Sequence, residues 1–168
     1  MTTTENAKTP RDSQVEMTEM VLPQHTNALG TIFGGVVMSW VDIAAAICAL
    51  RHARRQVVTA SVDALDFVAP IKLGWVANLK ASVNYVSHSS CEIGVKITSE
   101  NPVTGEVFHT ASAYVTMVAL DSHGRPTSMP PIKPETPDEL RRFKEGEERR
   151  RRRVENRKRQ KSQTPVKG

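Results

Sequence analysis

A single carboxylate lies inside an apolar stretch that follows a pair of glycines. Residues 27–46 read NALGTIFGGVVMSWVDIAAA, and Asp42 is the only charged residue among them. A carboxylate in apolar surroundings is costly unless it is paired or takes part in acid–base chemistry. Two interpretations are therefore open. Asp42 is either a structural group bonded to the backbone or to Ser39, or it is a general base.

The glycine pair, Gly34 and Gly35, stands where the apolar stretch begins. Its ordinary role would be a tight turn into a helix. A functional role is also open, because glycine at a helix start lets a substrate approach backbone N–H groups that can polarise a carbonyl. Asp42 follows seven residues after Gly35, which is about 10 Å along a helix. That distance is too long for Gly35 and Asp42 of one chain to contact the same substrate atom, so a second chain would have to supply one of the two groups.

The loop before the glycines carries two further polar candidates, His25 and Asn27, whose ordinary role would be an Asx turn. The chain has no G-x-S-x-G, H-E-x-x-H, P-loop or G-x-G-x-x-G motif, and its histidines are scattered, so no metal site is predicted. Cys48 and Cys91 lack a C-x-x-C spacing and are expected to be buried thiols in a reducing compartment. Four hydroxyl residues are by default ordinary strand and turn residues: Thr59, Ser61, Ser89 and Ser90.

One long helix and five strands are predicted. The helix covers residues 35–52, since apolar residues recur on one face: Val37, Trp40, Val41, Ala44, Ala45 and Cys48. Its other side is also mostly apolar, which is typical of a helix buried inside a fold. Strands are predicted at residues 15–22, 57–68, 75–87, 91–100 and 107–120. Their short connections favour an antiparallel sheet packed on one helix, a two-layer α+β domain. One helix cannot cover five long strands, so a homodimer is the expected minimum.

Charge divides the chain into a neutral domain and a basic tail. Residues 1–133 carry 10 Lys and Arg against 11 Asp and Glu, whereas residues 134–168 carry 13 against 7. Residues 1–13 are expected to be disordered, residues 14–133 to form the domain, and residues 134–168 to be an Arg-rich tail that is partly helical or disordered. A capping box at residues 136–139 and Glu-to-Arg pairs four residues apart favour a marginal, solvated helix there.

The composition limits the classes of partner. The basic pI gives no support for nucleic-acid binding by the domain, because the excess charge belongs to the tail. The Arg-rich run could contact nucleic acid or an anionic membrane, but a solvated helix is the simpler interpretation. The N-terminus lacks the apolar segment of a signal peptide, and the apolar run at residues 36–50 is too short to span a bilayer. We therefore expect a cytoplasmic protein with no membrane partner.

The stretch HTNALGTIFGGVVMSWVDIAAA resembles the H-x-N-x-x-G-x-x-x-G-G-x-x-M-x-x-x-D block of the hotdog-fold acyl-CoA thioesterases, which include bacterial short-chain and cytosolic long-chain acyl-CoA hydrolases. The stretch DALDFVAPIKLGWVANLKASVNYVSHSSCEIGVKI is similar to the family's second block, with its F-x-x-P, glycine turn and serine pair. The likeness covers about residues 15–131. It implies the hotdog fold, an antiparallel β-sheet wrapped around one long central α-helix.

The resemblance also implies an assembly and a reaction. Family members join two subunits through their sheets and often form trimers of dimers, with active sites between subunits. Asn27 of one chain and Asp42 of its partner match the catalytic pair of the family. Asp42 would act as general base on water, or less readily as a nucleophile. Asn27 would orient water or the thioester, and the Gly35 N–H would stabilise the oxyanion. Hydrolysis would release a free carboxylic acid and CoA without a cofactor.

The substrate contacts implied by the resemblance form a larger set, in which Thr59, Ser61, Ser89 and Ser90 would line the CoA path together with His25 and Gly34. Charge alone suggests Arg54, Arg55 and Lys96 for the CoA phosphates. Trp75 follows a turn glycine where many relatives carry an acidic residue, a difference that affects the rim and not the chemistry. A non-catalytic acyl-CoA-binding or regulatory module on the same fold is the alternative function.

Overall fold

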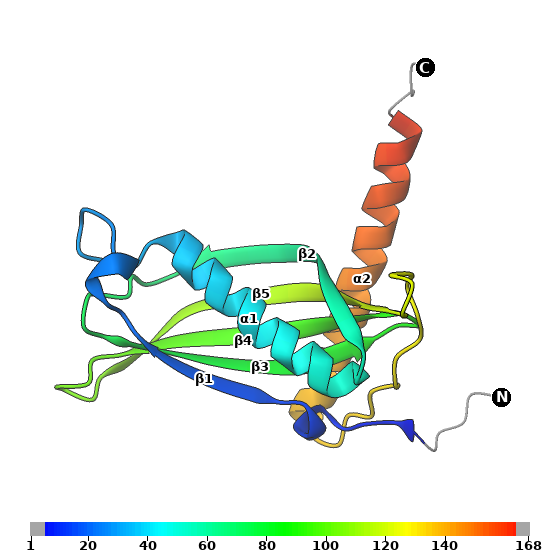
Figure 1. Cartoon of the computed structure of the whole chain (residues 1–168), viewed down its shortest axis with the longest axis horizontal. Coiled ribbons are helices and arrows are strands. Elements are labelled where there is room, and N and C mark those ends of the chain that lie inside the picture. Colours follow the sequence, from blue (N-terminus) through cyan, green and yellow to red (C-terminus); the bar gives the residue numbers. More distant parts are fainter. Residues whose placement is uncertain (1–5, 164–168) are drawn as a thin grey trace.

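The computed structural model describes residues 6–163 and consists of one curved sheet with a helix on each face (Figure 1). Two short 3-10 turns, at Pro10–Asp12 and Pro23–His25, flank the first strand. The main elements in chain order are β1 (Val15–Met20), α1 (Gly34–Ala53), β2 (Gln56–Phe67), β3 (Val76–Val86), β4 (Ser90–Glu100), β5 (Val107–Leu120) and α2 (Pro137–Gln163). The predicted strands and the first helix agree with these bounds within two residues.

All neighbouring strands of the sheet are antiparallel, and their spatial order is β1-β3-β4-β5-β2. Tight turns connect β3 to β4 and β4 to β5, as the sequence predicted. β2 is an edge strand, and its pairing with β5 is interrupted twice, between Thr59 and Ser61 and between Asp63 and Leu65. Such bulges bend a strand and break its ladder of hydrogen bonds.

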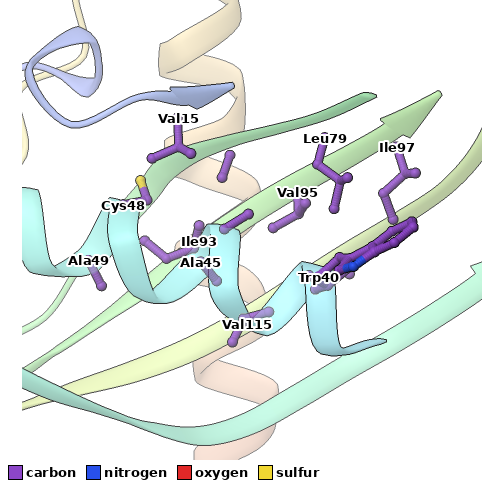
Figure 2. Packing of buried hydrophobic residues seen from close by; sticks show 14 of the residues in the cluster. Val15, Trp40, Ala45, Cys48, Ala49, Leu79, Ile93, Val95, Ile97 and Val115 are labelled. Carbon is purple, nitrogen blue, oxygen red and sulfur yellow. The ribbon is translucent and has the colours of Figure 1, made fainter. Parts of the chain in front are cut away.

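Helix α1 lies in the hollow of the sheet and supplies one side of the core (Figures 1 and 2). The predicted buried face is confirmed, and its alanines and Cys48 allow the helix to approach the strands closely. Opposite them are fully buried side chains of the sheet: Leu79, Ile93, Val95, Ile97 and Val115. By length and apolar composition alone α1 could cross a membrane. Its packing in the core accounts for that composition.

Two expectations about α1 need correction. The helix is not buried all round, because the sheet curves around one side only, and large apolar side chains such as Met38, Ile43 and Leu50 stay about half exposed. Asp42 is likewise exposed in the protomer and not enclosed in its core. An exposed apolar flank of this kind is typical of a surface that another subunit covers.

The segment before β1 is ordered from residue 6, contrary to the expectation for residues 1–13; residues 1–5 lie outside the described part of the chain. Lys8 pairs with Ile132 in a β-bridge. Its Nζ donates to the carbonyl oxygens of Arg51 at 3.1 Å and His52 at 2.6 Å. A cation at this position complements the negative end of the α1 dipole.

The tail is a docked helix, which corrects the expectation of a solvated one. The predicted capping box is present: Thr136 Oγ1 accepts from the Glu139 N–H at 3.2 Å, and Glu139 Oε2 accepts from the Thr136 N–H at 3.0 Å. Helix α2 then crosses the outer face of the sheet, the face away from α1 (Figure 1). Phe143 packs on Tyr85 of β3 with ring centroids 5.1 Å apart. The sequence prediction missed this contact because α2 meets the sheet mainly through charged side chains.

Candidate active site

Asp42 and Thr59 form the central contact of the site. Asp42 stands in the third turn of α1, and Thr59 lies in β2 just before the first bulge. The Thr59 hydroxyl donates a hydrogen bond of 2.6 Å to Asp42 Oδ1 and lies 3.4 Å from the sulfur of Met117. Ser39 is not the partner of Asp42, because its Oγ donates to the Val36 carbonyl at 2.8 Å. The carboxylate is thus oriented from a strand and remains open to solvent.

The start of α1 exposes backbone N–H groups. Phe33 is the N-cap residue and makes no side-chain capping bond. Its carbonyl oxygen accepts from the Val36 N–H at 2.9 Å, so the N–H groups of Gly34 and Gly35 are the ones left without an intrahelical acceptor. A Cβ on Gly35 would lie 2.6 Å from Cε1 of the Phe33 ring, so glycine lets the ring fold over the backbone. A Cβ on Gly34 would make only ordinary contacts, at 3.7 Å from Phe67. A Cβ at residue 35 would therefore displace the exposed Phe33 ring, whereas a Cβ at residue 34 would fit.

A small apolar cavity opens beside this helix start. Its volume is about 320 Å³. The residues that line it come from the loop before α1, from its first residue and from the end of β2 with the turn that follows: Thr31, Ile32, Gly34, Phe67, Val68, Ala69, Pro70 and Ile71. Apolar pockets of this size accept small apolar groups.

Asn27 organises the loop that leads to the helix. Its Oδ1 accepts hydrogen bonds from the N–H groups of Leu29 at 2.9 Å and Thr31 at 3.3 Å, and its Nδ2 donates to Thr31 Oγ1 at 3.0 Å. The Asx-turn role that the sequence left open is thus present. An amide nitrogen has a second N–H, which this loop does not use.

His25 is held by the same loop. Its Nδ1 accepts from the Leu22 N–H at 3.2 Å, and its ring meets the indole of Trp40 edge-on with centroids 5.3 Å apart. Its backbone carbonyl accepts from the Phe33 N–H at 2.8 Å. These contacts give His25 a structural function at the base of the loop and leave its predicted substrate contact a prediction.

The remaining predicted substrate residues are spread over the protomer. Arg54 and Arg55 follow the C-terminal end of α1, opposite its glycine start, and Ser89 and Ser90 form the turn into β4. The structure does not gather these residues around Asp42 within one chain. The hydroxyl of Ser61 is buried and has no hydrogen-bond partner among the described residues.

Lys96 lies on the outer face of the sheet, away from α1. It lines a groove of about 710 Å³ between the strands and the first half of α2, together with Lys80, His109 and Arg141. Two ion pairs at this groove, Lys80 with Glu16 at 2.5 Å and Arg141 with Glu145 at 3.0 Å, neutralise part of its charge. In the protomer, Lys96 is therefore on the opposite side of the sheet from Asp42.

Buried titratable groups lie near the other end of α1. Burial lowers the pKa of His52, whose Nε2 donates to the Pro130 carbonyl at 2.7 Å. Burial raises the pKa of the Cys48 thiol to about 12 and also raises that of Cys91, so both stay protonated. Among the described residues, no group of three or more His, Cys, Asp or Glu side chains is arranged to hold a metal.

Comparison with known proteins identifies the fold family. Residues 29–106, which contain Asp42 and Thr59, match the family model described as the thioesterase superfamily. A Bacillus subtilis protein described as an uncharacterized acyl-CoA thioester hydrolase is 43% identical over 77% of this chain and 76% of its own length. The chain belongs to the thioesterase superfamily. It is accordingly a thioester hydrolase with the hotdog fold, and its relatives group it with the acyl-CoA thioester hydrolases.

Further relatives agree with this grouping. The cytosolic acyl coenzyme A thioester hydrolase of Rattus norvegicus is 37% identical over 80% of this chain, which spans only 36% of that longer protein. The solved Staphylococcus aureus acyl-CoA hydrolase in complex with butyryl coenzyme A has a TM-score of 0.87 at 37% identity, covering 93% of this chain and 95% of that one. A solved hexameric acyl-CoA thioesterase has a TM-score of 0.84 at 37% identity, covering 95% and 99%.

Three residues that sequence reasoning missed lie on the outer face. Glu92 of β4 is a buried carboxylate, and Arg149 and Arg153 of α2 form ion pairs with it. The spacing of the two arginines, four residues apart on one helix face, was a usable signal. It was hidden because every residue from 149 to 153 is an arginine.

Proposed function

We propose that Asp42 is the general base of an acyl-CoA thioester hydrolase and deprotonates the water that attacks the thioester carbonyl. The observation that carries this role is the 2.6 Å hydrogen bond from Thr59 Oγ1 to Asp42 Oδ1. The bond occupies one carboxylate oxygen, Oδ1, and leaves the other, Oδ2, as the oxygen that would accept the proton. Water reaches the group because Asp42 is exposed in the protomer.

Variants of the Staphylococcus aureus relative support these roles. An aspartate, a threonine and an asparagine of that hydrolase have each been replaced by alanine in solved structures. Their positions are numbered one higher than Asp42, Thr59 and Asn27 of this chain. The same three residue types in the same order support a shared site.

The thioester carbonyl would bind at the start of α1. Its oxygen would accept from the Gly35 N–H, where the helix dipole and the uncapped first turn stabilise developing negative charge. The acyl group would extend toward the apolar cavity at Phe67. Attack by water forms a C–O bond, the C–S bond then breaks, and the proton taken up by Asp42 passes to the leaving thiolate.

The working site would be shared between two subunits, with Asn27 of one chain facing Asp42 of the other. Asp42 follows Gly35 by two helical turns, so the two residues of one chain are too far apart to contact the same substrate atom. The bulged edge strand β2 and the apolar flank of α1 offer a surface for a homodimer, and hexameric relatives support a trimer of dimers. The second N–H of the Asn27 amide would then point at the thioester or the water.

The remaining partners follow from the same proposal. The substrate is an acyl-CoA, which the butyryl-CoA complex of the Staphylococcus aureus relative supports. We propose that no metal or other cofactor takes part and that the protein acts in the cytoplasm, as the name of the rat relative suggests for that protein. His25, Gly34, Ser61, Ser89, Ser90, Arg54, Arg55 and Lys96 remain the proposed substrate contacts.

Replacing Asp42 tests the mechanism. Asp42→Asn keeps the side-chain shape but cannot accept a proton, so kcat for release of free CoA thiol should fall at least about 100-fold. Glu106→Gln, which removes an exposed carboxylate in the β4–β5 turn, is the matched control and should keep full activity. Unchanged turnover of a panel of acyl-CoAs by Asp42→Asn would refute the assignment. Acyl-CoA binding by the intact chain without any thiol release would instead favour the non-catalytic module.

A further inference from the structure

The outer face of the sheet carries a carboxylate that is nearly inaccessible to water. Glu92 of β4 is only 1% exposed. Arg149 of α2 donates to it from two nitrogens, Nε at 3.1 Å and Nη2 at 2.8 Å from Oε1, and Asn84 donates from Nδ2 at 3.2 Å. A buried charge needs this degree of pairing. Glu92 is therefore the fixed point to which α2 attaches.

The approach of α2 to the sheet is close and specific. A Cβ on Gly146 would lie 2.9 Å from Cβ of Tyr85 and 3.1 Å from Oε1 of Glu92, so only glycine permits this spacing. The guanidinium of Arg149 stacks 3.7 Å from the ring centroid of Tyr114 on β5. A guanidinium can stack on an aromatic ring while two of its nitrogens donate hydrogen bonds to a carboxylate. Helix α2 is thus held in one position over the strands.

Arg153 extends this attachment to the edge of the sheet. It stands one helical turn after Arg149, and its Nη1 donates to Glu92 Oε2 at 3.2 Å and also to Asp63 Oδ2. Glu92 belongs to β4 and Asp63 to β2, with β5 between them. One arginine therefore ties the edge strand to the interior of the sheet.

Asp63 occupies the bulged part of β2. It lies between the two interruptions of the β2–β5 ladder, and the next residue, Ala64, has a φ of 25°. Each bulge removes hydrogen bonds by which β5 holds β2. Thr59, which orients Asp42, lies directly before the first interruption.

We infer that Arg153 is a positioning residue for hydrolysis: by binding Asp63 it fixes bulged β2, and β2 in turn fixes Thr59 against Asp42. The inference rests on the proposed roles of Asp42 and Thr59. It assigns the basic tail a function inside the enzyme, because the arginines at 149 and 153 face the sheet and those at 151 and 152 pair with Glu148.

Steady-state kinetics of the full chain test the inference. Arg153→Gln should lower kcat by about 10-fold to 100-fold at little change in KM, because small displacements of a catalytic group have effects of that size. Arg153→Lys should recover most of the loss, and Asp63→Asn should reproduce it. Arg152→Gln, on the outer side of α2, is the matched control and should leave kcat unchanged.

A double-mutant cycle separates positioning from general stabilisation. In a Thr59→Ala background the Arg153→Gln change should have no further effect on kcat, because its route to Asp42 is already gone. Equal losses in both backgrounds, or a raised KM at constant kcat, would overturn the inference. Asp63→Asn is nearly isosteric, so it keeps the test open if Arg153→Gln fails to fold. Full activity of both variants, with Asp42→Asn inactive, would refute the inference alone, whereas an active Asp42→Asn would refute the proposed mechanism.

Discussion

The two helices of this protein attach to opposite faces of one sheet by different kinds of contact. Helix α1 buries alanine, valine and cysteine side chains in the core, while α2 places arginines on a buried carboxylate. Apolar packing is non-directional and tolerates small shifts, whereas a forked arginine–carboxylate pair demands one geometry. Apolar packing therefore holds α1 on the inner face, and a directional ion pair holds α2 on the outer face.

The largest stability effect is expected on the outer face. Arg149→Ala leaves Glu92 buried with only part of its pairing, and breaking a buried ion pair in this way costs about 3–5 kcal/mol. Chemical denaturation at fixed protein concentration measures the loss. The double change Glu92→Leu with Arg149→Met should restore most of the stability, because apolar residues of similar size can replace a buried pair. A negligible loss for Arg149→Ala would show that α2 docks by apolar contacts, as α1 does.

An inner-face truncation should cost somewhat less. Leu79 of β3 is fully buried against α1, and Leu79→Ala removes packing that no neighbour can replace, at about 3 kcal/mol. The midpoint of urea unfolding gives the value. The size of the loss should not depend on salt. A salt-sensitive loss would mean that charged contacts also hold the inner face, and the contrast between the two faces would fail.

Acid should weaken the inner face through His52. Burial lowers its pKa below the ordinary value of 6.5, and Lys8 lowers it further, whereas the hydrogen bond to the Pro130 carbonyl and the charge of Asp12 oppose the shift. The unfolded chain therefore takes up the proton first as the pH falls below about 6.5. The free energy of unfolding then drops by up to about 1.4 kcal/mol per pH unit until the folded pKa is reached. His52→Gln should remove this slope in unfolding curves between pH 7 and 5, and an unaltered slope would exclude His52 as its source.

The smallest effect is expected at the start of α2. Thr136→Ala removes the acceptor of the Glu139 N–H and should cost about 1 kcal/mol. Thermal unfolding followed by circular dichroism measures it, with Thr104→Ala in the β4–β5 turn as a control outside the helix. If α2 were a solvated helix that does not support the domain, the unfolding midpoint of the whole chain would not move.

Most of the fold was predictable from local pattern. Apolar residues recur every three to four positions in α1, and this spacing predicts that Val37, Val41 and Ala44 are buried. The antiparallel strands follow from their lengths and short connections. The ordered segment at Lys8 was missed because a polar stretch gives no sign of carbonyl oxygens that lie 43 and 44 residues away.

The site was predictable in its parts but not in its connections. Asn27, Gly35 and Asp42 stand out by residue type and by resemblance to a family. The hydrogen-bond partner of Asp42 could not be identified in this way. The candidate Ser39 lies on the same helix, whereas the actual partner, Thr59, lies in the bulged strand β2. Which strand residue meets Asp42 depends on how β2 packs beside α1, and no alternation of the sequence reveals that.

The sequence by itself determined the fold class, the core helix and the residue types of the site, because each depends on neighbours within a few turns of chain. Only the tertiary structure decided that Thr59 orients Asp42 and that Arg153 joins Asp63 to Glu92. These partners are separated by 17, 90 and 61 residues. Contacts at such separations depend on strand register and on where a helix docks, which the packing of the whole domain sets.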